Sequence, residues 1–134
     1  MVGKIHYPAT FVAWFVQYAL GALWYGALST SWMAAHAISP DNMDGSVAWP
    51  YILSALAGLI FTFTMAGLRA PLNVDNLRKG INFGLAVGLG LMAMTTVIHF
   101  AYLEKPLAAF LIDGGYDVIR GLSVGVILAI WRKE

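Results

Sequence analysis

Three ionisable residues lie in an otherwise apolar stretch near the end of the chain. Asp113, Asp117 and Arg120 fall within Leu107–Trp131, and their i, i+4, i+7 spacing puts them on one face of a helix. A charge in the hydrocarbon core of a bilayer costs about 2.5–3.5 kcal/mol on insertion scales and usually marks a partner or a function. Two carboxylates and one guanidinium leave one excess negative charge. A bound proton or a cation would remove that charge, so the pattern predicts a proton- or cation-responsive site.

Two polar residues on other apolar stretches are candidates for the same site. At about 1.5 Å per residue from Leu107, Asp113 lies about 9 Å deep, with Asp117 and Arg120 close to the midplane. The same counting places Gln17 in a polar layer with Asp117 and Arg120. It places His99 at the depth of Asp113, where a protonated imidazole would balance the carboxylate. Depth is all that counting gives, because the rotation of each helix is unknown.

A purely structural interpretation stays open. Gly114 and Gly115 could interrupt the helix, and Asp113 would then be an N-cap at the membrane surface, where acidic residues suit the helix dipole. Asp117 and Arg120 would form a local i, i+3 ion pair. Under this reading the charges only stabilise the fold.

The elements that would position these residues are four apolar helices. The chain is 60% hydrophobic and 11% charged, whereas soluble domains average roughly 45–50% and about 25%. Four runs reach the roughly 17–25 residues that a crossing needs: about 9–29, 49–68, 81–103 and 107–131. We expect an all-α, multi-pass membrane protein, folded as a single domain that forms an up-down four-helix bundle in the lipid bilayer.

The distribution of lysine and arginine predicts the orientation of the bundle. Six basic residues lie at the termini and in the second loop, and the first and third loops carry only Lys105. The six are Lys4, Arg69, Arg78, Lys79, Arg132 and Lys133. Both termini are therefore expected in the cytoplasm. A cleaved signal peptide is the rival interpretation of the first run, but about 20 apolar residues exceed the roughly 7–15 of a signal core.

Glycines at four-residue spacing predict where helices touch, because helices in lipid pack closely through small residues. Gly84 and Gly88 continue a stripe that starts at Gly80, and Gly121 and Gly125 form a second stripe on the next run. A short turn joins these two runs, which favours an antiparallel hairpin. A homo-oligomer or a partner membrane protein could use the same stripes.

Several classes of function find no support in the residues. The chain has no cysteine and a net charge of +1, so thiolate chemistry is excluded and nucleic-acid binding is not expected. His6, His36 and His99 fall on two sides of the predicted membrane, so we expect no metal site and no cofactor. Without a nucleophile motif, we do not expect an enzyme.

Two segments carry a family resemblance. GALWYGALSTSW (Gly21–Trp32) contains Gly-x-x-Trp-Tyr, and PLAAFLIDGGYDVIRGLSVGVILAIWR (Pro106–Arg132) contains Leu-Ile-Asp-x-Gly-Tyr. With four runs and a short third loop, the chain resembles a family of small bacterial integral membrane proteins classed as a domain of unknown function. The resemblance implies four helices in a bacterial inner (plasma) membrane, and it implies no activity. It also marks signature positions, which are Gly21, Trp24, Tyr25, Asp113, Gly115 and Tyr116.

Two functions are compatible with these residues. One is a small conduit or carrier responsive to protons or cations, working as a homo-oligomer with Asp113 as its key group. The other is a structural or accessory subunit of a membrane complex, with neither transport nor catalysis of its own.

Overall fold

A computed structural model describes residues 3–131, and every regular element in this range is helical. The long helices are α1 (Tyr7–Ala27), α3 (Trp49–Arg69) and α6 (Leu107–Ile130), together with a rod built from α4 (Leu77–Leu85), the π-helix η2 (Ala86–Ala93) and α5 (Met94–Tyr102). Two short elements, α2 (Ser29–Ala35) and the 3₁₀ turn η1 (Pro40–Asn42), connect α1 to α3. The predicted all-helical class is confirmed.

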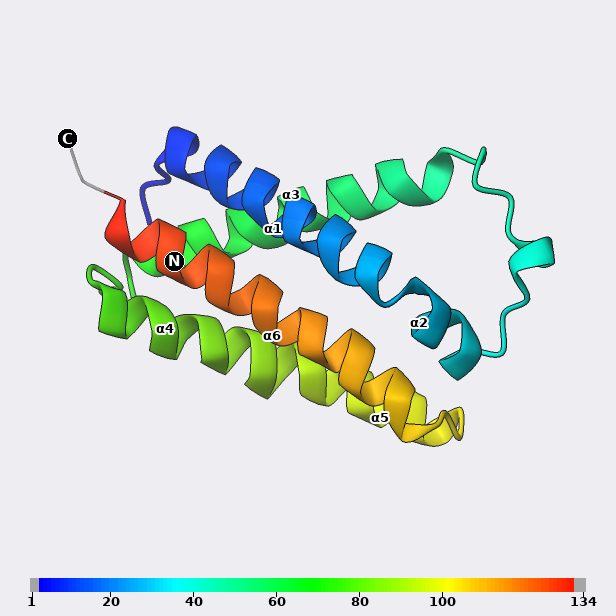
Figure 1. Ribbon diagram of the computed structural model, residues 1–134. Coiled ribbons are helices and arrows are strands. Elements are labelled where there is room, and N and C mark those ends of the chain that lie inside the picture. The colour runs from blue at the N-terminus through cyan, green and yellow to red at the C-terminus, as the bar shows by residue number, and fades with distance from the viewer. Residues whose placement is uncertain (1–2, 132–134) are drawn as a thin grey trace.

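Helix α6 occupies the centre of the fold (Figure 1). It contacts α1, α2, α3, α4, η2 and α5. Buried residues such as Ala109, Tyr116 and Leu128 occur along its length. The charged residues of α6 are therefore placed among neighbouring helices.

The α1–α2 connection is a sharp bend. α1 begins beside Pro8 in its first turn, a position that suits proline, with His6 as N-cap. It ends at Ala27, and the axis then turns by 75° into α2. Leu28 sits at the break with φ −105° and ψ 13°, outside the helical region. The bend folds α2 back against α6, which it contacts directly.

The glycine stripes form the contact between the α4–η2 rod and α6. A Cβ on Gly84 would lie 2.6 Å from the backbone oxygen of Gly121, and one on Gly88 would lie 2.7 Å from that of Asp117. A Cβ on Gly125 would come equally close to Gly80, at 2.6 Å from its oxygen. The backbones approach so closely that no side chain fits between them, as the two stripes predict.

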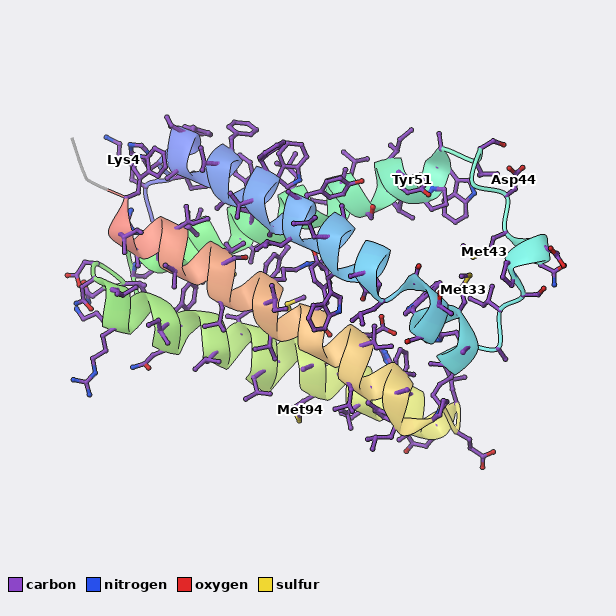
Figure 2. All side chains as sticks on the ribbon, in the orientation of Figure 1. Lys4, Met33, Met43, Asp44, Tyr51 and Met94 are labelled. Carbon is purple, nitrogen blue, oxygen red and sulfur yellow. The ribbon has the colours of Figure 1, made fainter. Side chains whose placement is uncertain are left out.

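Two helical rods are long and apolar enough to cross a membrane, namely α3 and Leu77–Tyr102, within residues 3–131. The bent α1–α2 pair makes a third if it counts as one span. α6 is long enough to cross a membrane, with 24 residues. It differs from the other rods in composition, because it contains Asp113, Asp117 and Arg120. Exposed side chains on the outer faces are largely apolar, as Met94 illustrates in Figure 2. This composition indicates a membrane protein.

The two ends of the bundle differ in chemistry. Figure 2 shows Lys4 at one end, and Met33, Met43, Asp44 and Tyr51 toward the other. Arg69 and Lys79 lie with Lys4, close to the α3–α4 loop, while the α1–α3 connection at the far end carries Asp41 and Asp44. The basic residues of the described chain are therefore concentrated at one end.

Candidate functional site around Asp113

Asp113 is held by three side chains that reach it from α1 and α2. One carboxylate oxygen accepts hydrogen bonds from the Tyr25 hydroxyl at 2.6 Å and the Trp32 indole N–H at 3.2 Å. The other oxygen lies 2.8 Å from Nε2 of His36. The side chains of His36 and Asp113 are only 13% and 16% exposed. A carboxylate in this setting is desolvated, but hydrogen bonds on both oxygens compensate for the lost water.

The local sequence explains how these partners converge. Tyr25 lies in the last turn of α1, and Trp32 and His36 are four residues apart, so they share one face of α2 and its C-cap. Their ring centroids are 5.0 Å apart, and the Phe100 ring lies 5.4 Å from His36 on the other side. The 75° bend turns this face toward Asp113, so the bend and the carboxylate stabilise each other.

Helix α6 runs without a break through Gly114 and Gly115. The interpretation of Asp113 as an N-cap is therefore wrong, since the N-cap of α6 is Pro106. Gly115 permits a close approach of Trp24, because a Cβ there would lie 3.1 Å from its ring, a tight contact that the indole would have to shift to relieve. The Trp24 indole N–H donates to the carbonyl of Ile112 at 2.9 Å. Tryptophan and glycine thus bring α1 against the α6 turn that carries Asp113.

A second polar contact lies one turn further along the α1–α6 seam. The Tyr116 hydroxyl donates to the backbone carbonyl of Gln17 at 2.8 Å and lies 3.2 Å from Oε1 of the same residue. Gly21 makes room for it, because a Cβ there would lie 2.5 Å from the Tyr116 oxygen. Gln17 is fully buried, and its Nε2 has no hydrogen-bond partner among residues 3–131. Gln17 thus lies inside the bundle, and its hydrogen-bond partner there is Tyr116.

Asp117 and Arg120 do not form the predicted ion pair. The described residues contain two salt bridges, His36–Asp113 and Lys79–Asp75, and neither involves this pair. Asp117 accepts a hydrogen bond from Thr96 of α5 at 2.6 Å.

The guanidinium of Arg120 lies over the Tyr116 ring at 4.7 Å and near the Phe61 ring at 5.9 Å. Distances of this kind are typical of cation–π contacts. The two charged residues turn toward different neighbours, Asp117 toward Thr96 of α5 and Arg120 toward Phe61 of α3 and Tyr116 of α6 itself, so the spacing on α6 does not bring them together.

His99 is not the histidine at the site. It lies exposed on α5, and His36 contacts Asp113 in its place. The expectation rested on depth alone, and His99 faces outward from the bundle at this position. His36 lies between the apolar runs 9–29 and 49–68, so counting depth along the runs does not place it.

A family model described as "Protein of unknown function (DUF1761)" matches residues 8–129, nearly the whole chain. This chain belongs to the DUF1761 family. No curated protein and no solved structure matches it. The predicted membership of a family of unknown function is confirmed.

The resemblance singled out residues of this DUF1761 protein that prove to be neighbours. Each of the three pairs joins α1 to α6: Gly21 with Tyr116, Trp24 with Gly115, and Tyr25 with Asp113. The Gly-x-x-Trp-Tyr and Leu-Ile-Asp-x-Gly-Tyr motifs are thus the two halves of one contact. Asp113 is the ionisable member of that contact.

Two residues of the DUF1761 site were missed, although the sequence holds a signal for them. Other aromatic residues near helix ends are exposed, since Trp49, Tyr51 and Tyr102 are each 60% or more exposed. Trp32 differs because His36 follows it by four residues. An indole and an imidazole on one helical face form a pair of donors, and such a pair indicates an inward-facing surface.

The site is better suited to a carboxylate and its protons than to a metal ion. Three nitrogen or hydroxyl donors meet one carboxylate, whereas hard cations require several converging oxygen ligands. Residues 3–131 contain no cluster of three or more histidine or acidic side chains that could hold a metal. What the geometry can do is bind, release or redistribute protons between Asp113 and His36.

Proposed function

We propose that this protein is a proton-responsive carrier or conduit of the plasma membrane, with four spans, working as a homo-oligomer. One observation carries the proposal, namely the Asp113 carboxylate with hydrogen bonds on both oxygens, one of them from an imidazole. Histidine changes charge near neutral pH more readily than any other side chain. Its contact with a carboxylate lets the pair exist in states that differ by a proton.

The helices and their charges support the four-span arrangement. α3 and Leu77–Tyr102 qualify as spans by themselves, and α1 joins them as part of a bent pair. α6 is the fourth, because its polar groups are covered by the other helices that it contacts. The basic end of the bundle faces the cytoplasm under the positive-inside rule.

The proton state of the site is linked to the position of α2. Trp32 and His36 hold α2 and its C-cap against α6 through Asp113 alone among the described acidic groups. Protonation of the carboxylate would weaken both contacts, since a neutral acceptor forms weaker hydrogen bonds than an ionised one. The bend at Leu28 would then open, which exposes the α1–α6 seam at that end of the bundle.

The decisive experiment is proton flux into proteoliposomes that contain a pH-sensitive dye. Asp113→Asn keeps the size of the side chain and removes its charge, so we expect it to abolish the flux. Asp41→Asn is the matched control, because Asp41 is exposed in η1, and its flux should equal that of the unmodified protein. Equal flux from Asp113→Asn and the unmodified protein would remove Asp113 from the mechanism.

The orientation can be tested with single cysteines, because the chain contains none of its own. We expect Ser39→Cys to react in intact cells with a membrane-impermeant maleimide, because residue 39 lies in the α1–α3 connection. Asn73→Cys, in the α3–α4 loop, should react only after the membrane is opened. The reverse pattern would invert the topology.

A structural role is the second candidate. It is favoured by the fact that both carboxylate oxygens of Asp113 already have hydrogen-bond partners. A carboxylate with three partners can serve simply as a clasp between α2 and α6, with the protein acting as an accessory subunit. In that case the unmodified protein carries no more protons than empty liposomes do, while Asp113→Asn still lowers its stability. Proton flux of the unmodified protein and stability of Asp113→Asn, measured together, therefore separate the two functions.

A further inference from the structure

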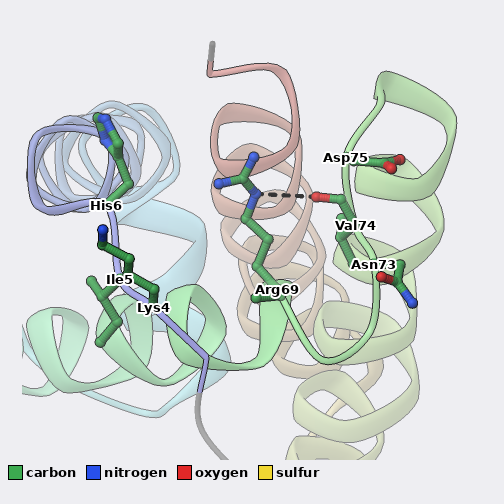
Figure 3. A pocket seen from close by; sticks show the side chains of 8 residues that line it. Lys4, Ile5, His6, Arg69, Asn73, Val74 and Asp75 are labelled. Carbon is green, nitrogen blue, oxygen red and sulfur yellow. Dashed lines mark hydrogen bonds between the residues drawn. The ribbon is translucent and has the colours of Figure 1, made fainter. Parts of the chain in front are cut away.

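A cavity of about 400 Å³ opens at the basic end of the bundle, away from Asp113. It lies between the N-terminal segment, the end of α3 and the α3–α4 loop (Figure 3). Its size falls within the roughly 300–1,000 Å³ typical of small-molecule pockets. The lining residues are Lys4, Ile5, His6, Arg69, Ala70, Asn73, Val74 and Asp75.

The walls of this cavity are held in place by hydrogen bonds and packing. The amide of Gly3 donates to the carbonyl of Gly67 at 2.8 Å, which fixes the N-terminal segment along α3. Val74 is buried in the hydrophobic core, with Ile5 packed against the same core. The amide of Val74 donates to the carbonyl of Arg69, the last residue of α3, and the amide of Asn73 donates to that of Ala70, its C-cap. Asn73 has φ of 52°, a conformation that asparagine adopts more readily than most residues.

The charge balance of the lining is positive. Arg69 donates from Nε to the carbonyl of Val74 at 3.1 Å. This bond fixes the guanidinium between the N-terminal segment and the loop, as Figure 3 shows. None of the hydrogen bonds among residues 3–131 uses its two terminal nitrogens, which are the groups that hold phosphate in a fork geometry. Lys4 contributes a second, exposed cation.

The one acidic residue of the lining is already paired. Asp75 accepts hydrogen bonds from Lys79 at 2.9 Å and from Asn76 at 3.0 Å. The Lys79 ammonium holds the pKa of Asp75 below its usual range. Asp75 is thus compensated from outside the cavity, and the charges of Lys4 and Arg69 are left for a ligand.

His6 adds a donor at the opposite wall. Its Nδ1 accepts the Ala9 amide N–H at 3.3 Å as the N-cap of α1. A neutral ring therefore carries its proton on Nε2, so the imidazole can donate but has no second acceptor to offer. Lysine, arginine and histidine together make a lining of donors, which suits an anion.

The position of the cavity relative to the membrane indicates the class of anion. α3 is one of the spans, and its 21 residues measure about 31 Å, close to the roughly 30 Å of the hydrocarbon core. Arg69 is its last residue, so the cavity lies at the level of the lipid headgroups. Basic pockets between helices at this level recognise phosphate groups of anionic lipids.

We propose that this cavity binds a phosphate group, presented by an anionic lipid headgroup or by free phosphate. Arg69 and Lys4 would neutralise its charge, and His6 and Asn73 would donate to its remaining oxygens. This site goes beyond the proton-responsive role of Asp113 and does not depend on it.

The test is native mass spectrometry of the protein after reconstitution in mixed phosphatidylglycerol and phosphatidylcholine. We expect the unmodified protein to retain phosphatidylglycerol in preference to phosphatidylcholine. The double variant Lys4→Gln/Arg69→Gln should lose about tenfold of that preference, because a hydrogen bond to a charged group is worth at least the roughly 1.4 kcal/mol that a factor of ten requires. Arg78→Gln/Lys105→Gln removes the same charge outside the cavity and should leave the preference unchanged.

Further arms keep the result interpretable. Lys4→Gln alone changes an exposed side chain outside the core, so a fall in preference there supports the site even if Arg69→Gln unfolds α3. Inorganic phosphate that displaces the lipid and raises the melting temperature of the unmodified protein, but not of the double variant, assigns the site to free phosphate. If inorganic phosphate does not displace the bound lipid, the site is assigned to the lipid headgroup. Equal preference in the cavity variants and their control would overturn the proposal.

Discussion

Replacing Gly121 with valine is expected to lower the free energy of unfolding by about 3 kcal/mol, the upper end of what overpacking usually costs. A Cβ at this position would lie 2.5 Å from the backbone oxygen of Gly84 and 2.6 Å from the Cα of Gly88. Backbone cannot move aside as a flexible side chain does, so the α4–η2 rod must separate from α6. The measurement is unfolding by SDS titration in dodecylmaltoside micelles.

Gly90→Val provides the control for the glycine prediction. Gly90 lies on the same rod, and a Cβ there would meet no atom within 4 Å. We expect a change within a few tenths of a kcal/mol, because valine has a somewhat better helix propensity than glycine. Equal losses in the two variants would mean that the close approach of the rods contributes nothing to stability.

Replacing Asp113 with alanine is expected to cost a similar amount, about 3 kcal/mol, for an electrostatic reason. The Tyr25 hydroxyl, the Trp32 indole and the His36 imidazole would all lose their acceptor at once. Buried donors without partners are costly, so α2 should detach from α6. Unfolding in micelles gives the energy, and hydrogen exchange over residues 29–36 should show the release of α2.

Two comparisons make the Asp113 prediction specific. Leu111→Ala changes an exposed residue on the same helix and should leave exchange in α2 unaltered. Tyr25→Phe should destabilise the unmodified protein but have little further effect in the Asp113→Ala background, since a double-mutant cycle isolates the shared hydrogen bond. Additive effects in that cycle would show that the two side chains act independently.

Local patterns in the sequence predicted most of what depends on short-range rules. Apolar runs of sufficient length predicted the long helices, and glycine spacing predicted the α4–α6 contact. The resemblance, in turn, picked out residues that form the α1–α6 seam. Each of these signals depends only on residues a few positions apart, or on a helix face that a fixed period defines.

The partners of Asp113 needed information that spacing on one helix does not contain. The bend at Leu28 has no proline to mark it, so α2 could not be placed. The orientation of His99 has a second cause, because η2 (Ala86–Ala93) lies between it and the α-helical turns of α4. A π-type turn closes over one more residue than an α-turn, so the facing of residues after η2 cannot be counted from those before it. Asp117 and Arg120 were paired by sequence distance, whereas their orientation is set by Thr96 and Tyr116 on either side.

The central place of α6 has a consequence for how the protein is made. α6 contacts every long helix, yet it is translated after all of them. Until the ribosome reaches Leu107, the earlier helices have only part of their packing surface available. Under the proposed four-span arrangement, Asp113, Asp117 and Arg120 enter the bilayer when Tyr25 and His36, the partners of Asp113, are already present. Insertion of α6 and its packing against the earlier helices would then occur in one step.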